Sequence, residues 1–272
     1  MLYWFIIQAG QVRVNGRKKT AGLGAGLGWL ITMFLFGLLI FKGALATGYN
    51  WDWSRVPAFF FDWQRMLPGP LLKGLWVTCQ IIFWSLGLTL LLGLATALAR
   101  LLGGPVLSGL ARVYLEIIRN TPLLVQLSII YFILGAVFDF SGFWAAVLAL
   151  SLFEGAYLSE IFRSGFLAVD EGQWQAAWCL GLSTPDTFGR IIGPQTAPML
   201  LPPMCSLVIS LVKDSALAST IAVYELTKET RDLVAETFLS FELWLTIAGV
   251  YLSLNLLMSA LGALLERRLG RP

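Results

Sequence analysis

Six long runs of apolar residues constrain the fold of this chain more than any other feature. The runs are Leu27–Thr47, Leu75–Ala99, Val113–Phe138, Phe143–Phe162, Leu200–Val223 and Leu243–Leu265. Each is close to the roughly 20 residues that a helix needs to cross the hydrocarbon core of a bilayer. Because a helix satisfies its own backbone polar groups there, we predict an all-α integral membrane protein with six transmembrane helices.

The composition supports a membrane protein and excludes several classes of function. Only 13% of the 272 residues are charged and 57% are hydrophobic, whereas a soluble domain is about 25% charged. The chain has no histidine, so catalysis by a histidine base and imidazole ligands for zinc are excluded. Its cysteines, Cys79, Cys179 and Cys205, form no CxxC pair, and a net charge of +3 is too small to indicate nucleic-acid binding. We predict no catalytic residue, metal site or cofactor in this chain.

Two interpretations fit the first run, a cleaved signal peptide and an anchor helix. Ala44-Leu45-Ala46 resembles a cleavage site, but the run is longer than the about 7–15 apolar residues of a signal peptide. We therefore predict an uncleaved helix over 27–47, preceded by a cytoplasmic tail over 1–26 and followed by a periplasmic segment over 48–70. A core of five helices over 71–268 and a short tail over 269–272 complete the predicted organisation.

The basic residues are distributed unequally between the two sides of the predicted membrane. Six spans place both termini on one side, and eleven Lys and Arg residues fall on that side against five on the other. Cytoplasmic loops carry an excess of Lys and Arg, so we predict that both termini and the loop at 169–198 are cytoplasmic. Trp51, Trp53, Trp63 and Trp244 border the opposite side, where tryptophan suits the membrane–water interface.

Two pairs of charged residues lie near the inner ends of predicted spans. Glu116 and Arg119 fall in the third span, and Glu160 and Arg163 fall in the fourth. Residues at i and i+3 are neighbours on a helix, so each pair can close on itself or join the other helix. The pattern leaves two interpretations open: structural salt bridges between helices, or a charged layer that closes a pathway.

A second charged cluster lies deeper in the predicted spans. Lys213 and Asp214 are about 13 residues, or roughly 20 Å, from the inner end of the fifth span, and Glu154 is near the middle of the fourth. Charges at that depth suit a zwitterionic solute, whose carboxylate would face Lys213 and whose amine would face one of the two carboxylates. A packing and gating set without solute contact is the alternative.

Uncharged polar residues extend this deep cluster. Ser215 and Ser219 are spaced i, i+4 and are predicted to line one wall together. Candidates for the opposite wall are Thr121, Pro122 and Gln126 of the third span. Pro122 has no backbone N–H, so it frees the carbonyl of Ile118 to accept a hydrogen bond.

The segment over 169–198 is predicted to form two short amphipathic helices rather than a plain connection. The first carries Trp174, Ala177 and Trp178 on one face and ends at Gly181; the second carries Phe188, Ile191 and Ile192 and ends near Pro194. Such a pair can dock in a groove on another protein or lie on the lipid surface. The pattern alone does not decide between them.

Several motifs, taken in order, resemble one family of proteins. Gln175-Ala176-Ala177, followed by Gly181, Ile191 and Pro194, resembles the EAA loop of bacterial ABC-importer permeases. The segments 116–126, 156–163 and 210–219 are similar to permeases of the polar amino acid uptake family, of the histidine, glutamine, glutamate and arginine type. The resemblance covers about residues 71–268. The chain departs from the family at Gln175, where Glu is usual, and at Gly193, where Leu is usual.

This resemblance implies the permease subunit of an ATP-driven importer in the bacterial inner membrane, with the five-helix core of a type I importer and one extra N-terminal helix. It would move polar L-amino acids from the periplasm to the cytoplasm. The implied partners are ATP-binding ABC subunits that hold ATP and Mg, a second permease chain of the same or a sister kind, a periplasmic amino-acid-binding protein, the amino acid substrate and membrane lipids. This chain has no GxxxxGK[ST] motif, so ATP hydrolysis is expected in the partner.

The resemblance also implies roles for the residues singled out above. Contact with the ATPase is expected from Trp174, Gln175, Ala176, Ala177, Gly181, Phe188, Ile191 and Pro194, with the Trp174 and Phe188 faces buried in that partner. The translocation pathway or gate is expected to include Glu116, Arg119, Thr121, Pro122, Gln126, Glu154, Tyr157, Glu160, Arg163, Lys213, Asp214, Ser215 and Ser219.

Two rival functions are less well supported by the sequence. A self-contained secondary transporter or another membrane channel is the first, but we find none of the internal repeats that such transporters commonly carry. An intramembrane enzyme is the second, and the HExxH and GxSxG motifs are both absent.

Overall fold

The computed structural model describes residues 48–269 without interruption, together with residues 28, 31, 32, 34, 35, 37, 38, 42 and 43. The chain divides into two units, Met1–Asp52 and Trp53–Pro272. In the first unit the described residues from 28 to 43 are helical, and the Thr32 hydroxyl donates to the Gly28 carbonyl at 2.9 Å. The predicted tail over 1–26, the rest of the predicted helix over 27–47 and the predicted tail beyond 269 lie outside the described residues.

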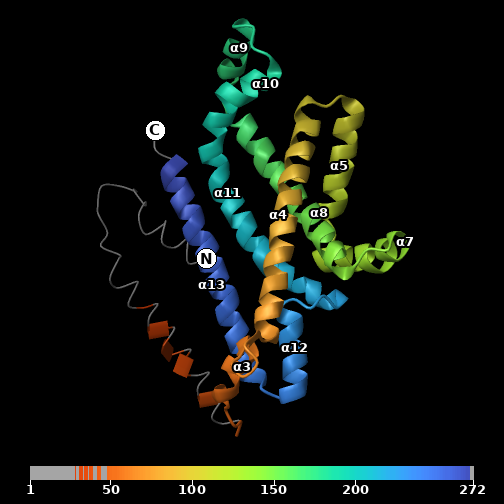
Figure 1. The fold of residues 1–272 in the computed structure, drawn as a ribbon. Coiled ribbons are helices and arrows are strands. Elements are labelled where there is room, and N and C mark those ends of the chain that lie inside the picture. The colour runs from red at the N-terminus through yellow and green to blue at the C-terminus, as the bar shows by residue number, and fades with distance from the viewer. Residues whose placement is uncertain are drawn as a thin grey trace. The chain divides into compact units, whose positions relative to one another are not determined.

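Four long helices form the frame of the second unit, as Figure 1 shows: α4 (Pro70–Leu102), α8 (Gly142–Leu167), α11 (Gly193–Asp214) and α13 (Ser240–Leu269). Each is long and apolar enough to cross a membrane, with α11 counted together with its flanking turns. A bent pair of helices is a further candidate. The described residues therefore hold four candidate spans, or five if the bent pair crosses as one. The predicted N-terminal span stays a prediction.

The predicted third span is not one straight helix. The chain forms α5 (Pro105–Arg119), a break, and then α6 (Leu123–Ile129), the π-helical turn η2 (Ile130–Leu134) and α7 (Gly135–Phe138). The two parts are bent by 108°. Pro122 is the N-cap of α6, with an extended ψ of 138°, and a proline disfavours the helical conformation in the residue before it. The prediction of a continuous span over 113–138 was wrong. It rested on apolar composition, which is the same for a straight and a bent segment.

The predicted fifth span has different ends from those expected. Helix α11 begins at Gly193, directly after the π-helical turn η3 (Phe188–Ile192), and is followed by a 3-10 helix, η4 (Ser215–Ile221). The chain leaves η4 at Ala222, whose backbone is left-handed with φ of 58°. Residues i and i+3 eclipse in a 3-10 helix. The i, i+4 spacing of Ser215 and Ser219 therefore does not place them on one wall, which corrects the α-helical prediction.

The helices pack closely where α4, α8 and α11 meet. Helices α4 and α8 lie against each other along much of their length, and the buried Ile81, Leu150 and Leu211 come from the three helices in turn. Gly93 of α4 permits this approach, because a Cβ there would lie 2.9 Å from the Leu158 side chain. Lipid tails are as apolar as leucine, so such close packing is a main source of helix association in a membrane.

Shorter elements lie at the two ends of the long helices (Figure 1). One end carries α9 (Glu171–Cys179) and α10 (Thr184–Thr187). At the other end, η1 (Trp53–Arg55), α3 (Val56–Phe60) and an antiparallel hairpin of β1 (Phe61–Asp62) and β2 (Leu67–Pro68) precede α4, and α12 (Leu226–Thr237) precedes α13.

A buried carboxylate fixes α12 to its neighbours. Glu225 is fully buried and caps α12, accepting from the backbone N–H groups of Thr227 at 2.9 Å and Lys228 at 2.8 Å. The Tyr251 hydroxyl of α13 donates to the same carboxylate at 3.0 Å. Burial raises the pKa of the Glu225 carboxyl, and the bonds from the two backbone N–H groups oppose this shift.

Candidate functional site

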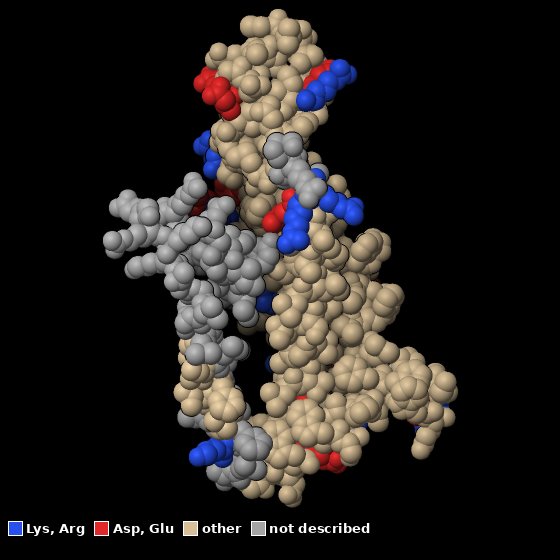
Figure 2. Space-filling view, turned by 90° about the vertical axis from the view of Figure 1, so that its left-hand side faces the viewer, with Lys and Arg blue, Asp and Glu red and all other residues tan. Residues whose placement is uncertain are grey.

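Charged side chains are unevenly distributed over the molecule. On the face shown in Figure 2, they gather toward the ends of the long helices, and a broad band of mostly uncharged residues lies between. A charge at membrane depth is costly and normally faces a partner or a water-filled cavity. The charged residues along the middle of the helices are therefore the candidates for contact with a solute.

One carboxylate, Glu160 on α8, binds three arginines. Arg100 of α4 contacts its Oε1 atom at 2.5 Å, Arg163 contacts its Oε2 atom at 3.0 Å, and Arg119 of α5 approaches Oε1 at 3.4 Å. The pairing of Glu160 with Arg119 and Arg163 agrees with the i, i+3 and cross-helix alternatives. Arg100 was missed because it follows the second apolar run and was counted as a loop charge. Helix α4 continues to Leu102, which places Arg100 inside the bundle.

Glu116 does not join this ion cluster. Its carboxylate Oε2 accepts from the Asn120 side-chain amide at 3.0 Å, and its backbone carbonyl accepts from the same amide at 2.7 Å. No ion pair of Glu116 is found in the described part of the chain. A single charged layer of Glu116, Arg119, Glu160 and Arg163 was predicted. Arg119, Glu160 and Arg163 form it, and Glu116 does not.

A polar pocket lies beside the bend between α5 and α6. It has a volume of about 280 Å³, and its lining residues are Leu115, Glu116, Arg119, Asn120 and Tyr157. The Arg119 guanidinium carbon lies 5.6 Å from the centre of the Tyr157 ring, within the range of a cation–π contact. The pocket therefore holds one cation, one anion and an aromatic face.

Gln126 braces the bend. Its side chain is 7% exposed, and its Nε2 atom donates to the Ile118 carbonyl and to the Thr121 hydroxyl, both at 2.7 Å. The carbonyl that Pro122 was predicted to free is thus satisfied by Gln126. The Oε1 atom of Gln126 is buried without a hydrogen-bond partner in the described part of the chain, so one acceptor of the predicted opposite wall remains available.

The deep charged cluster comes together as the spacing predicted. Glu154 of α8 is 3% exposed and lies within hydrogen-bond reach of the Asp214 carboxyl at the end of α11. Ser210 and Lys213 lie near the same carboxyls, and the charge of Lys213 acts on both of them. Helix α6, which begins at the bend, packs against η4 just beyond this cluster.

The two serines of the cluster are less available than predicted. The Ser215 hydroxyl donates to the Val212 carbonyl and the Ser219 hydroxyl to the Ala216 carbonyl, both at 2.7 Å. Both residues are buried. Their hydroxyls satisfy the 3-10 helix rather than lining a wall.

The loop over 169–198 has the predicted first helix and turn. The Asp170 side chain caps α9 by accepting from the Gly172 N–H at 2.7 Å, and Ser183 caps α10. Gly181 lies between them with φ of +71°, a conformation that favours glycine. The predicted second helix does not end at Pro194. It continues through η3 into α11, and Pro194 follows a π-helical turn in which the Gly193 N–H donates to the Phe188 carbonyl five residues earlier.

Trp174 and Phe188 pack inside this chain. Their ring centres are 5.1 Å apart, and Phe188 also lies 5.3 Å from Phe166 of α8. Both rings are half-buried against a cluster that includes Ile192. The rings therefore hold the loop onto its own span, and the burial of their remaining exposed surface in the ATPase stays a prediction.

Other residues of the loop are exposed for a partner. Trp178 is 60% exposed and Leu180 is 76% exposed at the tip of α9. Of the residues matched to the EAA loop, Gln175, Ala176, Gly181 and Pro194 are exposed, Ile191 is half-buried and Ala177 is fully buried. The Gln175 side chain donates to Glu171 at 3.3 Å. Sequence reasoning placed Trp178 on the loop's apolar face but did not single out Leu180, which lies in the turn.

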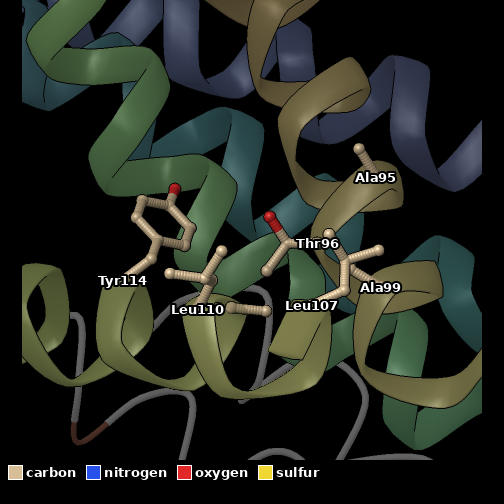
Figure 3. Close-up of a pocket in the computed structure, with 7 residues that line it drawn as sticks. Ala95, Thr96, Ala99, Leu107, Leu110 and Tyr114 are labelled. Atoms are coloured by element: carbon tan, nitrogen blue, oxygen red, sulfur yellow. The ribbon is translucent and has the colours of Figure 1, made fainter. Parts of the chain in front are cut away.

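A larger groove between α4 and α5 is apolar, as Figure 3 shows. Its volume is about 380 Å³, and its lining residues are Ala95, Thr96, Ala99, Leu107, Leu110, Ala111 and Tyr114. The Tyr114 hydroxyl donates to the Leu152 carbonyl of α8 at 2.6 Å. The groove offers no charged group to a polar solute, so it is not the candidate site.

The chain is similar to known transport proteins. The family model described as "binding-protein-dependent transport system inner membrane component" matches residues 89–271. The glutamine transport system permease protein GlnP of Escherichia coli K12 is 36% identical over 214 residues, which cover 77% of this chain and 98% of that protein. The L-cystine transport system permease protein TcyB of Bacillus subtilis 168 is 36% identical over 231 residues, 84% of this chain and 95% of that protein.

The chain also matches solved structures of ABC transporters. An amino acid ABC transporter crystallised with histidines has a chain that matches with a TM-score of 0.70 at 32% identity, covering 81% of this chain and all of that one. A methionine ABC transporter, MetNI, matches with a TM-score of 0.62 at 18% identity and 74% of this chain, a likeness of fold. The chain belongs to the family of binding-protein-dependent transport system inner membrane components, and it is a multi-pass permease subunit of the amino acid ABC importer type.

Proposed function

We propose that the chain moves polar L-amino acids from the periplasm to the cytoplasm, using energy from a separate ATPase. The observation that carries this proposal is the stacking of two charged levels along α8. Glu154 with Asp214 and Lys213 forms one level, and Glu160 forms the other six residues later, about 9 Å along the helix. Fixed charges of both signs replace the water that a zwitterion loses on entering a membrane.

The Glu160 level is proposed to close the pathway on the side of α9 and α10. Arginines of α4, α5 and α8 converge on this one carboxylate, so the contact ties three helices together. Separating any of the helices must break an ion pair that is partly withdrawn from water. These ion pairs therefore stabilise the closed state. Opening requires free energy from another step, such as the action of the ATPase.

The exposed tip of α9 is proposed to contact the ATPase. Trp178 and Leu180 are large apolar side chains left in solvent, and aromatic residues of this kind are enriched at protein interfaces. Trp174 and Phe188 fix the loop to α8 and to η3, which continues into α11. Movement of the tip is therefore expected to reach the span that carries Asp214. ATP and Mg would be held by the partner.

The remaining partners and the orientation follow from the family and the charges. A second permease chain and a periplasmic amino-acid-binding protein complete the proposed importer. Both termini and the α9–α10 loop are proposed to be cytoplasmic, because eleven basic residues fall on that side against five on the other. The organisation into a tail over 1–26, an extra span over 27–47, a periplasmic segment over 48–70 and a core over 71–268 is part of the same proposal.

Uptake in cells tests the proposal. Labelled L-glutamine, L-cystine and L-arginine are supplied to cells that lack this chain, with and without a plasmid that carries it. We expect uptake of at least one of them to depend on the plasmid and to be lost when the ATPase partner is inactivated. Uptake that persists without the ATPase would instead indicate a secondary transporter.

A further inference from the structure

The polar pocket beside the bend between α5 and α6 includes one residue of α8, and this residue lies between the two charged levels of that helix. Tyr157, which lines it, is three residues beyond Glu154 and three before Glu160, or about 4.5 Å from each along the helix. We propose that this pocket is a separate holding site for the main-chain groups of the transported amino acid. This inference rests on the proposed function and deepens it.

The pocket has free hydrogen-bonding capacity of both signs. The Arg119 guanidinium carries five N–H donors, and its one hydrogen bond, to Glu160, is long at 3.4 Å. Glu116 binds Asn120 through Oε2, and its Oε1 atom has no hydrogen-bond partner in the described part of the chain. An α-carboxylate can therefore bind Arg119 while an α-ammonium binds Glu116, with both bonds assisted by charge.

Arg119 can leave Glu160 without leaving that carboxylate unpaired. Arg100 and Arg163 hold Glu160 at 2.5 Å and 3.0 Å, and their side chains are more buried than that of Arg119. A carboxylate that enters the pocket thus replaces Glu160 as the partner of Arg119, and the other two ion pairs persist. The site is built into the edge of the closing layer rather than beyond it.

The mixed charge of the pocket favours an amino acid over a simple anion. A lipid phosphate or an inorganic anion at Arg119 would face the Glu116 carboxylate across the same pocket, and like charges repel. A zwitterion satisfies both groups at once. The pocket's side-chain specificity is expected to be low, because its charged groups are matched to the atoms that all amino acids share.

Binding to the intact complex tests the proposal. The complex of this chain with its ATPase is placed in nanodiscs without the binding protein. Equilibrium binding is then measured with the tritiated form of an amino acid whose uptake depends on this chain in the cell assay. Its α-amide, which lacks the carboxylate, and its N-acetyl derivative, which lacks the cation, are the competitors. The measured quantities are the ratios of affinity for the free amino acid to affinity for each derivative.

We expect Arg119→Gln to weaken binding at least tenfold and to bring the acid-to-amide ratio close to one. Glu116→Gln is expected to bring the ratio of affinity for the free amino acid to affinity for its N-acetyl derivative close to one. Arg119→Lys is expected to keep a higher affinity for the acid than for the amide. Arg112→Gln is the matched control. It removes a guanidinium from α5 about two turns before Arg119 that does not line the pocket, so both ratios are expected to stay at their wild-type values.

Two results would overturn the inference while the proposed function stands. One is wild-type ratios in both Arg119→Gln and Glu116→Gln, and the other is no binding by a wild-type complex that takes up the amino acid. If Arg119→Gln does not assemble with the ATPase, Glu116→Gln decides, because it keeps the shape of the side chain. If the wild-type complex shows no uptake of any tested amino acid, the proposed function fails and this inference is rejected with it.

Discussion

Arg100 is predicted to be the strongest partner of Glu160, although Arg119 was the partner that the sequence indicated. The Arg100 side chain is 17% exposed and contacts Glu160 at 2.5 Å, whereas the Arg119 side chain is 43% exposed and lies at 3.4 Å. Water screens the more exposed pair. Replacing Arg100 by Gln should therefore destabilise the protein more than the same change at Arg119.

The magnitudes follow from these exposures. Two unit charges about 4 Å apart interact by about 4 kcal/mol at an effective dielectric constant of 20, which is an upper limit for a partly buried pair. Pairs in water give about 0.2–1 kcal/mol in double-mutant cycles. We expect a coupling energy between Glu160 and Arg100 of about 2 kcal/mol, between these limits, and a coupling energy between Glu160 and Arg119 of about 1 kcal/mol or less.

Double-mutant cycles in detergent measure both couplings. Glu160→Gln is combined in turn with Arg100→Gln and Arg119→Gln, and the free energy of unfolding is read from tryptophan fluorescence during reversible denaturation. A coupling to Arg119 that equals or exceeds the coupling to Arg100 would refute the reasoning. The charge swap of Arg119→Glu with Glu160→Arg is not expected to restore stability, because an arginine at position 160 would face Arg100 and Arg163.

Three further predictions concern other parts of the chain. Gly181→Val should abolish co-purification with the ATPase at a normal membrane level of this chain, since a left-handed backbone costs a non-glycine residue about 1–2 kcal/mol and Gly181 has φ of +71°; normal association with normal transport would contradict this. Asp214→Asn should lower uptake at least tenfold with assembly intact; normal uptake in Asp214→Asn together with failed assembly of Asp214→Leu would make the residue structural. Burial raises the pKa of Glu225, so its contribution to stability is present at low pH and lost as the pH rises through that raised pKa. The melting temperature should therefore fall more from pH 5 to pH 8 in the wild type than in Glu225→Gln, and equal falls would count against it.

The apolar runs predicted the long helices well because hydropathy measures what a bilayer selects. Helices α4, α8 and α13 fall on three of the predicted runs. The runs could not show where the chain bends. Pro122 breaks the third run, whereas Pro198, Pro202 and Pro203 are accommodated inside α11, so the presence of a proline does not by itself tell a break from a continued helix.

The charged residues were identified better than their partners. The deep cluster of Glu154 with Asp214 was found because buried charge in an apolar run is rare. The predicted partners of Glu160, Arg119 and Arg163, are confirmed. The third partner, Arg100, was missed, because it lies 60 residues away and only tertiary packing joins the two residues. In the same way, Trp174 and Phe188 were correctly read as an apolar face, but the sequence could not tell whether this chain or a partner covers it.

Reconstituted transport tests the central claim most directly. The complex of this chain with its ATPase is placed in proteoliposomes that enclose ATP, the binding protein is added outside, and accumulation of tritiated L-glutamine, L-cystine and L-arginine is measured. We predict accumulation of at least one of them that requires enclosed ATP and is at least tenfold slower with Asp214→Asn. Accumulation that needs an ion gradient but no ATP, or the absence of any accumulation, would contradict the account.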